Sequence, residues 1–113
     1  MKIDYRARGK MSAQERRLRS ELMQLVHSGG LLRASMIRMA RRCGHSGCGC
    51  ARGKLHVSWY VAQSMRGRRR MMYVAASWEG VVREWVVRQK RVKRLLDQVS
   101  QLYWQRLKGR KEE

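Results

Sequence analysis

A hairpin sequence decides the fold: residues 56–75 read His56-Val-Ser-Trp-Tyr-Val-Ala-Gln-Ser-Met-Arg-Gly-Arg-Arg-Arg-Met-Met-Tyr-Val-Ala75. Residues typical of strands dominate 56–64 and again 69–75, and the segment between them contains Gly67. Two such runs joined by a short glycine-containing segment predict two antiparallel strands and a tight turn. The predicted tip gathers four arginines and has no acidic residue nearby.

Alternation along the first strand of this hairpin separates its side chains into two faces. Trp59 and Val61 fall on one face, and His56 and Tyr60 fall on the other. The main apolar stripe is therefore expected opposite His56. Trp59, Tyr60 and Tyr73 can stack on unpaired bases, although aromatic side chains of a sheet more often pack in its core.

Three cysteines precede the hairpin in the run Cys43-Gly-His-Ser-Gly-Cys48-Gly-Cys50. Thiolates at these spacings, followed by the imidazole of His56, can complete a tetrahedral zinc shell, and the glycines allow tight turns between them. Four protein ligands leave no open position, so the predicted Zn²⁺ is structural. His45 is the alternative to His56 as fourth ligand. An odd number of clustered cysteines is more typical of metal ligands than of disulfides.

The flanking segments predict two helices and a further strand. Residues 12–28 begin with a Ser-x-x-Glu capping box and continue with leucines at helical spacing. Residues 31–42 fit either a helical face or an alternating strand, and we favour the strand. Residues 77–108 predict a long amphipathic helix with Ser77 as its N-cap. The first helix packs antiparallel along it, or two copies of the chain pair, and the sequence does not separate these options.

The predicted fold class is α+β. It consists of an N-terminal helix, a small antiparallel sheet of about three strands with a zinc knuckle, and a long C-terminal amphipathic helix. We expect a single small domain over residues 1–113, with a basic arm at 1–10, the knuckle and hairpin within 31–76, and a polar tail at 109–113.

The charge balance points to a polyanionic partner. The chain has 113 residues, and 27 Lys and Arg against 8 Asp and Glu leave a net charge of +19. Such an excess repels itself in the free protein, and nucleic acid is the simplest partner that neutralises it. The predicted phosphate contacts lie around the knuckle, at the hairpin tip and on the long helix. They are Arg38, Arg41, Arg42, Arg52, Lys54, Arg66, Arg68, Arg69, Arg70, Arg88, Lys90, Arg91 and Arg94.

Several classes of protein are disfavoured. No stretch approaches the length of a transmembrane helix, and the first residues lack the apolar core of a signal peptide. We therefore expect no membrane partner. We expect a cytoplasmic location, in association with the nucleoid or with a ribonucleoprotein. The signatures of zinc deaminases are missing, and residues 43–76 contain no carboxylate for a metal nuclease. We therefore predict that the protein is not an enzyme.

Short motifs through the middle of the chain carry a family resemblance. They are Ala34-Ser-Met36, Arg41-Arg-Cys-Gly44, Gly47-Cys-Gly-Cys-Ala-Arg-Gly53, His56, Trp59-Tyr60, Arg66-Gly-Arg68 and Tyr73-Val74. This pattern resembles a family of small uncharacterised bacterial, archaeal and phage proteins. The resemblance implies the same fold and metal, with His56 rather than His45 beside the three cysteines, and it implies no activity. The chain departs from the family at Ala34, where glycine is usual, at His45, where lysine is usual, and in having no proline.

Together these features predict a non-enzymatic, zinc-stabilised nucleic-acid-binding protein. Structured RNA or a ribonucleoprotein is slightly favoured because arginine predominates and aromatic side chains are available for stacking. One alternative is a regulator that binds duplex DNA. The other is a basic adaptor subunit of a mobile-element or phage machine, which docks on a larger protein through an apolar helix face.

Overall fold

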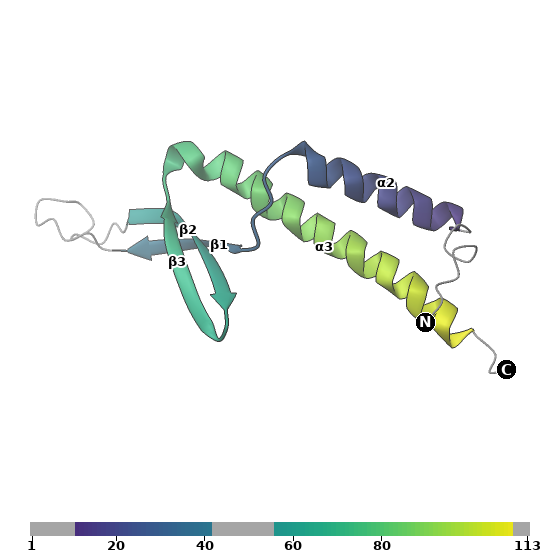
Figure 1. Cartoon of the computed structure of the whole chain (residues 1–113). Coiled ribbons are helices and arrows are strands. Elements are labelled where there is room, and N and C mark those ends of the chain that lie inside the picture. The colour runs from purple at the N-terminus through teal and green to yellow at the C-terminus, as the bar shows by residue number, and fades with distance from the viewer. Residues whose placement is uncertain (1–10, 42–55, 110–113) are drawn as a thin grey trace, which may run out of the picture. The chain divides into compact units, whose positions relative to one another are not determined.

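The computed structural model describes residues 11–41 and 56–109 and confirms the predicted α+β fold (Figure 1). The elements in chain order are α2 (Ala13–Ser28), β1 (Ser35–Arg41), β2 (His56–Met65), β3 (Arg68–Val74), a 3-10 turn η2 (Ala76–Trp78) and α3 (Glu79–Lys108). They belong to two compact units. We call residues 1–29 with 90–113 the helical unit, and residues 30–89 the sheet unit.

The start of α2 confirms half of the predicted capping box. The Ser12 side chain accepts a hydrogen bond of 3.1 Å from the backbone N–H of Glu15, as an N-cap should. The Glu15 carboxylate does not complete the box, because it is bonded to Arg19 and Tyr103 instead. The helix ends at Ser28, the predicted last residue, with Gly29 as C-cap.

Within the helical unit, α2 runs antiparallel to the second half of α3. Glu15, near the start of α2, contacts Tyr103, whereas Glu21, which is later in α2, contacts Arg91, which is earlier in α3. Of the two arrangements that the sequence left open, the structure therefore shows pairing of the two helices within one chain. Leu95 faces inward at 5% exposure, while the next residue, Leu96, is 51% exposed.

The sheet unit contains three antiparallel strands in the order β1-β2-β3. The strand favoured within residues 31–42 is confirmed as β1, which pairs with β2 from Ser35 opposite Ala62 to Arg41 opposite His56. The hairpin is also confirmed, and its strands differ from the predicted bounds by one residue at their ends.

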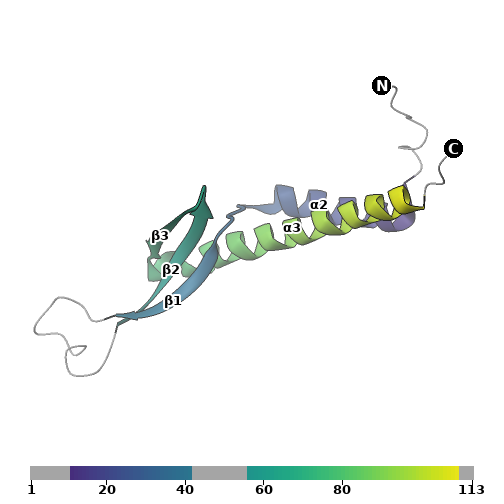
Figure 2. The same cartoon turned by 90° about the horizontal axis from the view of Figure 1, so that it is seen from below.

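The two faces of the sheet differ in what covers them (Figure 2). On the covered face, Trp59 and Val61 pack with Val74 against Val82 and Val86 from the first turns of α3. The opposite side, which we call the open face, carries two cross-strand rows. These rows are Ile37–Tyr60–Tyr73 and Ser35–Ala62–Met71. The predicted separation of Trp59 and Val61 from His56 and Tyr60 is thus confirmed by the strand register.

The start of α3 is anchored by backbone contacts. The N–H of Leu32 donates to the carbonyl of Trp85 at 3.1 Å. A Cβ added at Gly30 would lie 2.6 Å from the Trp85 ring, so this close approach requires glycine.

The prediction that Ser77 caps the long helix is wrong. Ser77 lies inside η2, whose Trp78 N–H donates to the carbonyl of Ala75 at 2.9 Å. None of the helices in the described part of the chain is long and apolar enough to cross a membrane.

Candidate nucleic-acid interface

The hairpin tip is a two-residue turn formed by Arg66 and Gly67. Met65 pairs with Arg68 across the turn, and φ is 52° at Arg66 and 75° at Gly67. Positive φ at both central residues matches the right-handed twist of the strands, and Asn-Gly is the usual choice for it. An arginine at this position is conformationally unfavourable by about 1 kcal/mol, so the turn holds Arg66 in a strained backbone conformation.

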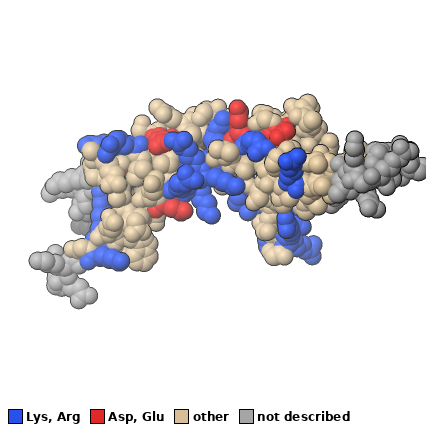
Figure 3. Space-filling view, turned by 180° about the vertical axis from the view of Figure 1, so that it is seen from behind, with Lys and Arg blue, Asp and Glu red and all other residues tan. Residues whose placement is uncertain are grey.

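The next three arginines continue the charge along β3. Strand alternation and the register with β2 place Arg68 and Arg70 on the covered face and Arg69 on the open face. All three side chains are exposed. In Figure 3, Lys and Arg side chains gather on the projecting part of the hairpin. The tip therefore presents positive charge to both sides of the sheet.

Neutral groups, rather than carboxylates, hold the arginines at the base of this tip. Arg70 donates two hydrogen bonds to the Gln63 Oε1 oxygen, from Nε at 3.0 Å and from Nη2 at 2.5 Å. The Gln63 amide in turn donates to the backbone carbonyl of Arg33 at 2.5 Å, and the Arg33 guanidinium donates to the carbonyl of Ser64 at 3.1 Å. These bonds orient the guanidinium groups without neutralising their charge.

Carboxylates are missing from a long part of the sequence. From Leu22 to Trp78 the chain contains ten Lys and Arg and no Asp or Glu. This span includes all three strands. Their arginines therefore have no acidic neighbour in the same strand or turn.

The arginines of the first part of α3 are used inside the sheet unit. Arg83 forms an ion pair of 2.9 Å with Glu79, and its guanidinium lies 4.6 Å from the ring centre of Trp59. Arg88, a predicted phosphate contact, donates to the backbone carbonyl of Gly30 at 2.9 Å. Arg38 is exposed on the covered face opposite Trp59.

The predicted contacts on the second half of α3 belong to the helical unit. Arg91 forms an ion pair with Glu21 of α2. Lys90 and Arg94 are exposed, and no ion pair joins either of them to another residue of the described ranges. The structure thus brings Arg66, Arg68, Arg69 and Arg70 together and leaves the contacts on the long helix as a separate group.

Of the predicted metal ligands, the structure describes only His56. Cys43, Cys48, Cys50 and the alternative ligand His45 lie outside the described residues, as do Arg42, Arg52 and Lys54. Arg41 is described as part of β1 through its backbone pairing with His56. Among the residues the structure describes, no three His, Cys, Asp or Glu side chains gather as a metal site. The zinc site stays a prediction.

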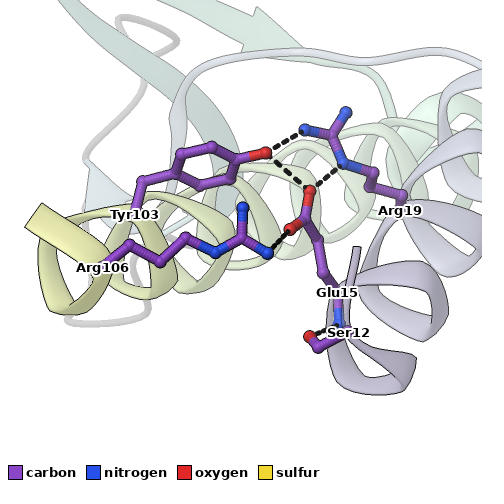
Figure 4. A network of polar contacts seen from close by, with 5 residues as sticks. All are labelled: Ser12, Glu15, Arg19, Tyr103 and Arg106. Atoms are coloured by element: carbon purple, nitrogen blue, oxygen red, sulfur yellow. Dashed lines mark hydrogen bonds and ion pairs between the residues drawn. The ribbon is translucent and has the colours of Figure 1, made fainter. Parts of the chain in front are cut away.

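A buried carboxylate organises the helical unit (Figure 4). The side chain of Glu15 is fully buried, and its Oε2 oxygen accepts hydrogen bonds from Arg19 Nε at 2.7 Å and from the Tyr103 hydroxyl at 2.8 Å. Arg106 Nη2 lies 3.2 Å from the other oxygen, Oε1. Sequence reasoning assigned Glu15 a capping role and missed this network, because its partners lie on a helix far along the chain.

The surroundings of Glu15 keep it ionised. Burial by itself raises the pKa of the Glu15 carboxyl, but hydrogen bonds from Arg19 and Tyr103 and the charges of Arg19 and Arg106 outweigh burial and leave this pKa below its ordinary value. The hydrogen bond to Glu15 raises the pKa of the Arg19 guanidinium correspondingly. The network is therefore a charged, structural centre.

An apolar groove of about 550 Å³ lies within the sheet unit. Its lining includes Leu32, Val61, Met72, Val74, Trp78 and Trp85, and Gln63 and Arg70 belong to it as polar members. Trp78 and Trp85 meet edge to face, with ring centres 6.1 Å apart. Met72 is 70% exposed and Trp78 is 55% exposed, so the groove is open to a partner. No local sequence pattern indicates this groove, because its walls come from separate segments of the chain.

The open face carries two tyrosine side chains. Tyr60 and Tyr73 meet edge to face with ring centres 5.8 Å apart and an interplanar angle of 69°. Tyr73 is 57% exposed. Trp59, the third aromatic residue considered for stacking, packs against the core of the covered face instead.

These observations define a small α+β protein whose sheet unit is strongly basic. A family model described as "Domain of unknown function (DUF6788)" matches residues 9–88, and the chain belongs to this family. The expected membership of an uncharacterised family is confirmed in that general form, while the motif pattern itself stays a prediction. A comparison with curated proteins finds no match, and neither does a comparison with solved structures.

Proposed function

We propose that the protein is a non-enzymatic, intracellular nucleic-acid-binding protein whose hairpin arginines bind phosphates. The observation that carries this proposal is the charge of the sheet unit. Ten basic residues and no acidic residue occupy the span from Leu22 to Trp78, and four exposed arginines meet at the hairpin tip. Arginine presents a planar fork of donors that matches phosphate oxygens, and phosphates supply the negative charge that this span lacks.

RNA, free or in a ribonucleoprotein, is favoured over duplex DNA in this proposal. Aromatic side chains on the open face suit bases that are not paired, and such bases are the usual targets of RNA-binding sheets. Binding of duplex DNA by the arginine tip in a groove is the competing form of the same function.

A structural zinc ion is part of the proposal. Cys43, Cys48, Cys50 and His56 would hold it, and thiolates with one imidazole are a common donor set for structural Zn²⁺. The pairing of Arg41 with His56 supports this assignment, since it fixes both ends of the connection that contains the cysteines. Zinc content should fall when His56 is replaced by Gln and should be retained when His45 is replaced by Gln. The reverse result would assign His45 instead.

The test of phosphate binding compares two variants that lose equal charge. One replaces Arg66, Arg68 and Arg69 by Gln; the control replaces Arg16, Arg17 and Lys108, which are exposed residues of the helical unit, by Gln. Fluorescence anisotropy with structured RNA, duplex DNA and single strands is measured at several salt concentrations. In the tip variant, the magnitude of the negative slope of log K against log salt should decrease by about 0.9 per lost contact on duplex DNA and by about 0.7 on single strands.

Two results would contradict the proposal. Equal losses in the tip variant and the control would show that net charge alone matters. Absence of salt-dependent binding to all three nucleic acids would remove nucleic-acid binding as the function.

The apolar groove favours a second candidate function, a basic adaptor that docks on a larger protein. Exposed apolar walls with Arg70 beside them suit apolar side chains of a segment that also carries carboxylates. A photo-crosslinking residue at Met72, on the covered face, should then capture one acidic protein in cells, and Trp78→Arg should abolish the capture. Position 65 is the matched control, because Met65 is an exposed methionine of the same hairpin that does not line the groove.

A further inference from the structure

The open face of the sheet carries a pair of tyrosines next to the arginine tip. We infer that this face stacks unpaired bases of a single-stranded nucleic acid on Tyr73, with Arg69 binding a neighbouring phosphate. This inference rests on the proposed function and specifies the kind of nucleic acid and the residue that holds its bases.

The geometry of the two rings suits stacking. Tyr60 lies on the central strand and pairs across to Tyr73 on the edge strand β3. Their edge-to-face contact, at 5.8 Å between ring centres, holds the Tyr73 ring in place although 57% of the residue is exposed. A ring that is already oriented loses little freedom when a base stacks on it.

Apolar neighbours extend this surface beyond the two rings. Ile37 stands beside Tyr60 in the same cross-strand row. Met71, which is 42% exposed, follows in the next row on β3. Ala62 in that row is buried, and Ile37 and Tyr60 are half-buried, so the accessible part of the surface is formed by Tyr73 and Met71 on β3. An exposed aromatic ring with an apolar neighbour on a sheet is the arrangement on which sheet proteins stack bases of single strands.

The charge beside this surface selects a nucleic acid over other ligands with apolar faces. Arg69 is on the open face of the same strand as Tyr73, about 13 Å away at 3.3 Å per residue, a distance that a few nucleotides span. The strands and the turn contain no carboxylate. A sugar or a neutral peptide would not neutralise the positive charge of Arg69, whereas each nucleotide carries one negatively charged phosphate.

The same geometry favours single strands over a duplex. In a duplex the faces of the bases are stacked on one another and only their edges are accessible in the grooves. A tyrosine ring that lies on a sheet reaches the face of a base only when that base is unpaired.

The experiment separates stacking from phosphate binding. Anisotropy is measured with a short oligothymidylate and with an abasic oligomer of equal length, which has the same phosphates and no bases. Tyr73→Ala should weaken binding of the oligothymidylate by about 5- to 150-fold, the equivalent of 1–3 kcal/mol per stacked base, and leave its salt slope unchanged. Arg69→Gln should lower the slope by about 0.7 on both oligomers.

Trp104→Ala is the matched control, because Trp104 is an equally exposed aromatic residue of the helical unit at 58%. Tyr73→Phe keeps the ring and should bind like the wild type. Tyr73→Leu keeps an apolar strand residue and removes the ring, so it decides the question if Tyr73→Ala fails to fold. It should bind as weakly as the alanine variant is expected to.

Wild-type affinity for Tyr73→Leu would overturn the inference, as would equal binding of the oligothymidylate and the abasic oligomer. In both cases salt-dependent binding would remain and the proposed function would stand. Failure of the wild type to bind either oligomer, structured RNA or duplex DNA would remove both.

Discussion

The helical unit and the sheet unit use arginine in opposite ways. In the helical unit, guanidinium groups from two helices converge on carboxylates, with Arg19 and Arg106 at Glu15 and Arg91 at Glu21. In the hairpin of the sheet unit and just before β1, guanidinium groups are held by an amide oxygen or a backbone carbonyl, and within this unit it is Arg83 on α3 that pairs with a carboxylate, Glu79. Arginine therefore forms ion pairs on the helices and has no acidic neighbour along the hairpin, and the proposed function rests on this difference.

The largest expected effect concerns the buried carboxylate of Glu15 in the helical unit. Glu15→Gln removes a buried charge that three side chains contact, and it should destabilise α2 by about 3 kcal/mol, the scale for breaking a buried ion pair. Hydrogen exchange of the α2 amides should speed up accordingly, while exchange in β2 and nucleic-acid affinity should not change. Glu84→Gln, at an exposed position of the sheet unit, is the control.

The same carboxylate makes the helical unit sensitive to acid. Its lowered pKa means that ionised Glu15 stabilises the folded state above the ordinary value of 4.5, and that this stabilisation is lost as the pH falls through the lower, folded-state value. Protection of α2 amides should therefore be constant above about pH 4.5, decline as the pH falls from there to the lower pKa of folded Glu15, and level off below it. A profile in Glu15→Gln with the same decline would show that another group is responsible.

Salt should move the two units in opposite directions. Raising sodium chloride from about 0.1 M to about 1 M screens repulsion among the hairpin arginines and should stabilise the sheet unit, by about 1 kcal/mol at most. The exposed ion pair between Arg91 and Glu21 should weaken under the same conditions. Amide exchange in β2 and α2 measures both changes, and a shift of the same sign in both units would contradict the comparison.

The smallest expected effect concerns the tip of the hairpin. Arg66→Asn should stabilise the sheet unit by a few tenths of a kcal/mol, since asparagine tolerates the positive φ of 52° better than arginine does, and should lower nucleic-acid affinity. Arg66→Gln removes the same charge without relieving the backbone. Thermal melts and anisotropy on both variants separate the two effects, and equal melting temperatures would show that the turn is not strained.

Local patterns predicted the elements of this fold well and long-range pairings poorly. The hairpin, the strand before it and both helices follow from periodicity, from Gly67 and from the Ser12 cap, all of which act over a few residues. The predicted Ser77 cap was wrong because a 3-10 turn that begins at Ala76 carries the chain into α3.

The candidate site divides in the same way. The arginine tip and the acid-free span are visible in the sequence. The partners of Glu15 and the walls of the groove are not, because Tyr103, Trp78 and Leu32 reach their places only through tertiary packing. The open face lies between these cases: the register assigns Tyr60 and Tyr73 to it, but their exposure depends on which face α3 covers.

The backbone pairing of Arg41 with His56 has a consequence for how this family can vary. Because β1 and β2 pair without interruption from Ser35–Ala62 to Arg41–His56, a one-residue insertion or deletion inside either strand would turn the side chains that follow it to the opposite face of the sheet. Changes of length within the family should therefore fall outside these paired strands, and alignments of the family should be anchored on them.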